Sequence, residues 1–145
     1  MAMDLAKLLL SKNRALERFL TLSEEFLALA EKGDLDGMET FHAGRDRILQ
    51  GLELYDRRIG QLASEAAATP EQRRAAVAEI LPILAERDRI LARIARCDER
   101  ILGCIERERE RVTREMNGAR KAQSTLSKFK SGWVADSGEG LDRKL

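Results

Sequence analysis

Few residues in this 145-residue chain are of a type that could carry out acid-base, nucleophilic or metal chemistry. His42 is the only histidine and directly follows Phe41, which favours a packed or surface histidine over a catalytic one. General acid-base and nucleophilic sites need complementary groups that converge in a pocket. The sequence holds no such set, no glycine-rich phosphate loop after a strand and no Cys/His spacing typical of a metal site. We therefore expect no enzyme activity, no cofactor and no metal.

The two cysteines, Cys97 and Cys104, stand seven residues apart. On one helix, a rise of ~1.5 Å per residue separates them by about 10 Å along the axis. A disulfide needs Cα atoms within roughly 7 Å of each other. The spacing therefore excludes a bridge within the chain, and it favours buried thiols in a reducing compartment over a disulfide between two chains.

The charge balance is nearly even, with 26 basic and 25 acidic residues and a formal net charge of +1. Such a chain has no overall field to attract nucleic acid or an anionic membrane. No window approaches the roughly 18 to 20 uninterrupted apolar residues of a membrane span, and Met1 to Leu10 lack the basic start and long apolar stretch of a secretory signal. We expect a cytoplasmic protein with no nucleic-acid partner and no stable membrane insertion.

The composition is that of long helices, because the hydrophobic fraction is 43%, aromatic residues make up only 4%, and Leu, Ala, Arg and Glu dominate. Apolar residues recur three and four positions apart in three successive segments. Connections of two to four residues force neighbouring helices to run antiparallel. The sequence predicts an all-α fold, an antiparallel up-down-up helical bundle of three to four helices.

The first two helices are expected to be separated by a turn at Gly33, which can take the left-handed conformation after a helix end. The first helix carries an apolar stripe from Leu5 to Ala30. Asp34 can then accept the first free amide hydrogens of the second helix. The second helix has a heptad seam, made of Met38, Phe41, Arg45, Ile48, Leu52, Tyr55, Ile59, Leu62 and Ala66.

The third helix is expected to begin at Pro70, with Thr69 as its capping residue and Gln72 completing a capping box. Its predicted seam consists of Val77, Leu81, Leu84, Leu91, Ile94, Ile101, Ile105, Val112 and Met116. Pro82 predicts either a kink or a separate short helix before it. We assign residues 1–130 to a helical bundle with an extended C-terminal helix, and residues 131–145, which have linker composition, to a flexible tail.

Charged residues also fall on the predicted seams, namely Arg45 in the second helix and Asp88 and Asp98 in the third. A charge at such a position must be paired or lie near a helix end. Arg45 could meet either aspartate, because the sequence does not fix the register of the helices. We interpret the three residues as fixing the register of the second and third helices.

Three glycines, Gly37, Gly44 and Gly51, repeat every seven residues, each directly before a seam residue of the second helix. A glycine inside a helix costs roughly 1 kcal/mol relative to alanine. The repeat therefore predicts the close approach of a neighbour, which is either the first helix or a bound partner helix. This makes the three glycines a secondary candidate for partner binding.

The main candidate surface lies where the third helix outruns the other two. Its partner-binding residues are predicted to be Ile101, Ile105, Val112, Met116, Ala119, Ala122, Leu126, Phe129 and Trp133. Four basic residues, Arg120, Lys121, Lys128 and Lys130, flank the last part of this stripe. Three interpretations remain open: the stripe folds back on its own bundle, lies on a membrane surface, or captures a partner helix by helix-in-groove packing.

Several of these segments resemble the FlgN and FliT type flagellar secretion chaperones, which are small cytosolic helical bundles. In the first helix and the turn after it, the similarity rests on Leu16 to Leu22, Ser23-Glu24-Glu25 and Glu31-Lys32-Gly33-Asp34-Leu35-Asp36. In the later helices it rests on Arg45 to Leu49, Ile90 to Ile94, Asp98 and Ile101. The similarity covers most of the chain and consists of helix and turn patterns.

The resemblance implies a cytoplasmic chaperone of type III flagellar export. Such a chaperone binds the C-terminal helices of hook-filament junction (hook-associated) or filament-cap proteins and prevents their premature assembly. It also implies contacts between the C-terminal region and export-gate or ATPase components, and the stripe from Ala119 to Trp133 occupies that place. A tyrosine that some relatives use at the gate is not evident, since Tyr55 lies in the second helix. The alternative is a structural coiled-coil adaptor that self-associates, for example as a homodimer, through its helical seam.

Overall fold

The structure, a computed structural model, describes the backbone of residues 2–65 and 69–137 and the side chains of residues 5–65 and 69–132. Within this part the chain forms only helices, in the order α1 (Ala2–Ala30), α2 (Met38–Glu65) and α3 (Pro70–Ser137). It divides into two compact units, Met1–Ile105 and Glu106–Leu145, which we name the bundle unit and the distal unit. The predicted all-α helical bundle with a long third helix is confirmed.

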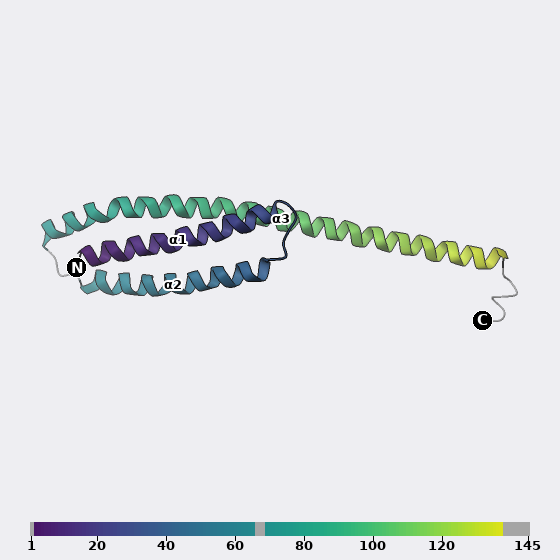
Figure 1. The fold of residues 1–145 in the computed structure, drawn as a ribbon, viewed down its shortest axis with the longest axis horizontal. Coiled ribbons are helices and arrows are strands. Elements are labelled where there is room, and N and C mark those ends of the chain that lie inside the picture. The colour runs from purple at the N-terminus through teal and green to yellow at the C-terminus, as the bar shows by residue number, and fades with distance from the viewer. Residues whose placement is uncertain (1, 66–68, 138–145) are drawn as a thin grey trace. The chain divides into compact units, whose positions relative to one another are not determined.

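In the bundle unit, α1, α2 and the part of α3 up to Ile105 run side by side, each antiparallel to the next along the chain (Figure 1). α1 supplies the largest share of the buried apolar side chains. α2 supplies three, Phe41, Leu52 and Leu62. Its remaining predicted seam residues, from Met38 to Ile59, are half-buried in the described structure, so the heptad pattern of α2 correctly identified its inner face.

The turn between α1 and α2 is built as the sequence predicts around Gly33, which has a φ of 85°. Its amide donates to the carbonyl of Ala30 at 2.9 Å, and the amide of Asp34 donates to the carbonyl of Leu29 at 3.0 Å. The expected capping of α2 by Asp34 is wrong. Its carboxylate accepts instead from the amide of Asp36 at 3.1 Å, inside the turn.

The start of α3 is closed by the predicted capping box. The Thr69 amide donates to Gln72 Oε1 at 3.1 Å, and the Gln72 amide donates to Thr69 Oγ1 at 3.2 Å. From there α3 continues through Pro82 as one helix, so the alternative of a separate short helix is wrong. Beside the proline, the buried amide of Asn13 on α1 donates to the Ile83 carbonyl at 3.0 Å, which ties the two helices together at this point.

The buried face of α3 matches the predicted seam only in part. Val77, Leu81 and Leu91 are exposed. The residues that reach the core are Ile90, Ile94, Cys97, Ile101 and Cys104. Ile94 and Ile101 of the predicted seam are therefore confirmed as core residues, and Ile105 packs against the core. The prediction left out Ile90, Cys97 and Cys104.

α3 ends at Ser137, seven residues beyond the boundary expected at residue 130. Residues 131–137 therefore continue the helix and do not start the expected tail. The rest of that tail, residues 138–145, lies outside the described residues. None of the helices that the structure describes has both the length and the apolar character needed to cross a bilayer.

Candidate partner-binding surfaces

The distal unit presents an apolar stripe that no described side chain covers. Val112, Met116, Leu126 and Phe129 are 40% to 68% exposed. Ala119 and Ala122, which lie between them, are exposed as well. The side chain of Trp133 lies outside the described residues. The structure thus keeps six of the nine predicted partner-binding residues together on open helix surface.

The first two residues of the predicted surface belong to the bundle unit instead. Ile101 is only 4% exposed and is part of the core, and Ile105 is half-buried against that core. α2 still covers α3 at this level, since Asp98 is bonded to Arg45. Including Ile101 in an open binding face was therefore wrong, because Ile101 still packs in the core of the bundle unit.

The charges of the distal unit change along the helix. Arg111 pairs with Glu108, and its guanidinium also lies 2.6 Å from Glu115. The hydrogen bond from Arg111 lowers the pKa of Glu108, and the Glu108 carboxylate in turn raises the pKa of Arg111. Beyond Glu115 the next acidic residue is Asp136. Residues 116–135 therefore carry only positive charge beside the apolar stripe.

A partly buried ion pair crosses from α2 to α3 in the bundle unit. Arg45 donates to Asp98 at 3.1 Å, whereas Asp88 pairs with Arg87. Of the two aspartates that the sequence offered as partners of Arg45, Asp98 is therefore the one that it binds. The Arg45 guanidinium also lies 4.4 Å from the ring centroid of Phe19 and 5.0 Å from that of Phe41. Such a pair favours one register of α2 against α3, because a shift by one turn would leave both charges unpaired.

Beside this ion pair lies a cavity of about 220 Å³, which we name the Phe41 pocket. Phe41 stacks on Phe26 there, with ring centroids 4.2 Å apart. Asp98 Oδ1 is buried and accepts no hydrogen bond from the part of the chain that the structure describes. Leu102, at the open side, is 58% exposed. The pocket is lined by Phe26, Met38, Phe41, His42, Arg45, Asp98, Ile101, Leu102 and Ile105.

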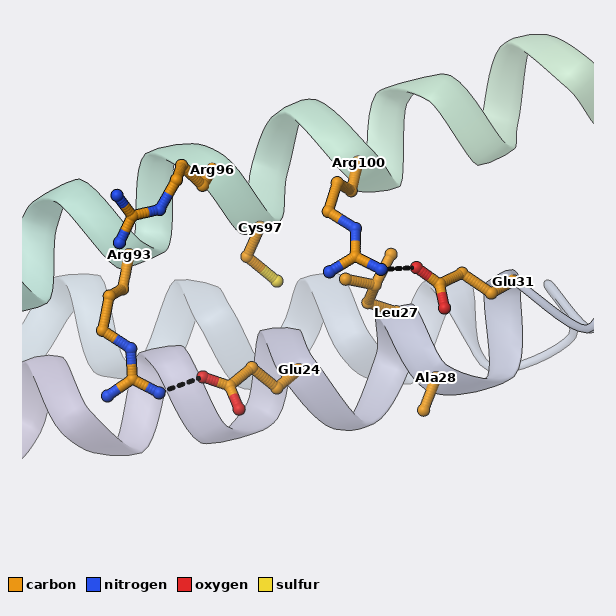
Figure 2. A pocket seen from close by; sticks show the side chains of 8 residues that line it. All are labelled: Glu24, Leu27, Ala28, Glu31, Arg93, Arg96, Cys97 and Arg100. Atoms are coloured by element: carbon orange, nitrogen blue, oxygen red, sulfur yellow. Dashed lines mark hydrogen bonds and ion pairs between the residues drawn. The ribbon is translucent and has the colours of Figure 1, made fainter.

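A second cavity, of about 460 Å³, lies between α1 and α3 (Figure 2). Two ion pairs bridge it, Arg93 with Glu24 at 3.1 Å and Arg100 with Glu31. The thiol of Cys97 lies between them, and burial, helped by the nearby Asp98 carboxylate, raises its pKa. A thiol held protonated in this way is a poor nucleophile. We interpret the cavity as a surface groove between α1 and α3 that the two ion pairs bridge. Cys97 beside it is a core residue.

The glycine repeat of the second helix has one close neighbour. A Cβ added at Gly44 would lie 2.9 Å from Leu22 Cδ2, so α1 is the helix that approaches there. Cβ atoms added at Gly37 and Gly51 would meet no heavy atom within 4 Å. The prediction of close approach holds for Gly44 alone. Gly37 precedes α2, and its carbonyl accepts from the Phe41 amide at 2.9 Å.

The chemistry-bearing residues form no cluster in the described structure. His42 is exposed, and its ring centroid lies 5.6 Å from that of Phe41. No group of three potential metal ligands occurs among the described side chains. Comparisons with protein-family models, curated proteins and solved structures found no match to the chain. Its function must therefore be argued from its own surfaces.

Proposed function

We propose that the protein is a cytoplasmic chaperone of type III flagellar export. In this proposal it binds the C-terminal helices of a hook-associated or filament-cap protein and prevents their premature assembly. The observation that carries the proposal is the uncovered apolar stripe from Val112 to Phe129 on the distal part of α3. Large apolar side chains in a continuous exposed patch are typical of surfaces that a partner covers.

The spacing of the stripe supports a helical partner. Val112, Met116, Ala119, Ala122, Leu126 and Phe129 lie three or four residues apart, which is the pattern that helix-in-groove packing uses. An exported axial protein presents amphipathic helices that would otherwise polymerise, and such helices can cover this stripe. Since residues 117–132 carry four basic and no acidic side chains, acidic residues beside the client's own stripe would favour binding.

The bundle unit is the part of the chain that has a packed core. Its core is continuous through all three helices, and ion pairs join α1 to α2 and α3 to both. The distal unit, by contrast, offers its side chains to solvent. A binding helix that is already formed loses less conformational entropy on capturing a client than a segment that must first fold.

The test is a binding measurement between the purified protein and the C-terminal segments of hook-associated and filament-cap proteins. We expect a discrete complex that is lost when the chain is truncated after Asn117. Phe129→Glu should weaken the complex at least about tenfold, because the substitution places a charge in the apolar interface. The matched control is Leu54→Glu in α2, a position that is 65% exposed and belongs to the bundle unit.

Two results would contradict the proposal. If the truncated protein binds the client segments as well as the full chain does, the distal stripe is not the binding site. If co-purification from the source cell yields neither a flagellar axial protein nor an export component, the export role itself is wrong.

A further inference from the structure

We infer that the distal helix of one copy docks into the Phe41 pocket of a second copy, with Phe129 as the anchoring side chain, and that the two copies do so reciprocally. This inference goes beyond the export-chaperone proposal, because it describes what the protein does when no client is present. It depends only on this chain and can be tested with the purified protein alone.

The Phe41 pocket has the size and lining expected for one large apolar side chain. Its volume of about 220 Å³ is below the range of roughly 300 to 1,000 Å³ that is usual for small-molecule sites. The stacked rings of Phe26 and Phe41 form one wall, and an entering aromatic ring gains from packing against them. Leu102 stands exposed at the open side and would be covered by the same helix.

The pocket also contains an acceptor that lacks a donor. Asp98 Oδ1 is buried and receives no hydrogen bond from the described residues, which is costly for a carboxylate oxygen. Phe129 is flanked by Lys128 and Lys130, each of which carries an ammonium with three donors. A lysine beside the anchoring ring can supply the missing charge-assisted hydrogen bond.

The charges around the two surfaces are complementary. Residues 31–42, which include three of the residues that line the pocket, contain four carboxylates and a single lysine. Glu31 is already paired with Arg100, which leaves Asp34, Asp36 and Glu39. The docking segment, residues 117–132, contains four basic and no acidic side chains. Such a pairing speeds encounter and selects the orientation of the helix.

A second copy supplies the docking helix in the form that the structure describes. α3 is helical without a break from Pro70 to Ser137, and a second copy docks with this helix intact. Each copy offers one pocket and one distal helix, so the reciprocal contact closes a dimer and leaves neither surface open.

The experiment is sedimentation of the full chain over a range of concentrations, with Leu102→Glu in the pocket rim and Phe129→Glu in the anchor. We expect a monomer–dimer equilibrium in the unmodified protein and at least about tenfold weaker dimerisation in each variant. Both positions are exposed, so the variants should keep the fold, which circular dichroism can verify. Leu54→Glu, on exposed α2 surface, is the control that should leave the dimer unchanged.

Mixing the two variants gives the sharpest readout. The Leu102→Glu protein keeps an intact distal helix, and the Phe129→Glu protein keeps an intact pocket. An equimolar mixture should therefore form heterodimers with one docked helix, although each variant alone stays monomeric. Added salt should weaken the unmodified dimer, because the complementary charges are exposed.

Three outcomes would overturn the inference. A protein that is monomeric at all concentrations has either no docking or docking within one chain. A dimer that Leu102→Glu leaves intact while Phe129→Glu abolishes it is held by pairing of the two distal helices. A mixture of the variants that stays monomeric would show that one pocket and one distal helix do not recognise each other.

Discussion

The two parts of α3 carry similar apolar stripes and use them differently. From Ile90 to Cys104 the stripe is buried in the core of the bundle unit, whereas from Val112 to Phe129 it is exposed in the distal unit. The spacing is alike in both parts, since apolar residues recur every three or four positions. A heptad pattern therefore predicts that a helix face is suited to be covered, but not which chain covers it.

The ion pairs of the bundle unit and of the distal unit also differ in which segments they join. In the bundle unit several ion pairs join separate helices, as in Lys12 with Asp56 at 2.6 Å and Arg45 with Asp98 at 3.1 Å, beside local pairs such as Arg87 with Asp88. In the distal unit Arg111 pairs with Glu108 and Glu115 of its own helix. Local pairs of this kind support a helix that lacks tertiary contacts, because an isolated helix is only marginally stable in water.

The largest expected difference between the two parts is the effect of removing an aromatic ring. Phe41→Ala deletes a buried ring that stacks on Phe26 and contacts Arg45, and should lower the free energy of unfolding by about 3 to 5 kcal/mol. Phe129→Ala deletes an exposed ring and should change it by less than about 0.5 kcal/mol. Urea denaturation followed by circular dichroism measures both values.

The experiment must compare the unfolding of the monomer in both variants. Both substitutions are therefore made in a Leu102→Glu background, which blocks the proposed dimer. A large loss of stability in Phe129→Ala on this background would contradict the division of α3 into a covered and an uncovered part. It would mean that the distal helix packs on its own bundle.

A smaller effect is expected at the ion pair that crosses the bundle. Arg45→Ala removes the bond to Asp98 and the contacts with the Phe19 and Phe41 rings, and should cost about 1 to 3 kcal/mol. Arg111→Ala, which breaks only pairs within the distal helix, should leave the cooperative unfolding of the bundle unit unchanged. Equal losses in both variants would show that the Arg45 pair is no stronger than an exposed one.

Local signals in the sequence were sufficient for the end of α1 and the start of α3, although not for the start of α2 or the end of α3. Gly33 and the pair Thr69 and Gln72 were assigned correctly, because a left-handed glycine and a capping box act through bonds between near neighbours. The inner face of α2 was also predictable, since that helix has one dominant apolar stripe. What depends only on local geometry could be predicted from the sequence.

The inner face of α3 could be predicted only in part, and the partner of Arg45 could not be predicted. The predicted seam included Ile94 and Ile101 of the core, but it also included Leu81 and Leu91, which are exposed, because spacing alone does not show which side chains fit α1 and α2. The repeat of Ile90, Cys97 and Cys104 every seven residues was the signal that could have found the buried stripe. The Phe41 pocket arises from three segments distant in sequence, and no spacing rule would reveal it.

The smallest expected effect on the free energy of unfolding concerns the distance between α1 and α2 in the bundle unit. Gly51→Ala adds a methyl group in open space inside α2 and should raise the free energy of unfolding by about 1 kcal/mol through helix propensity. Gly44→Ala adds one that would lie 2.9 Å from Leu22 Cδ2, so the leucine must move and part or all of that gain is lost. Both values come from chemical denaturation under the same conditions. Equal gains at the two positions would mean that α1 and α2 are further apart at Gly44 than the structure has them, and that the repeat of glycines along α2 does not mark a helix contact.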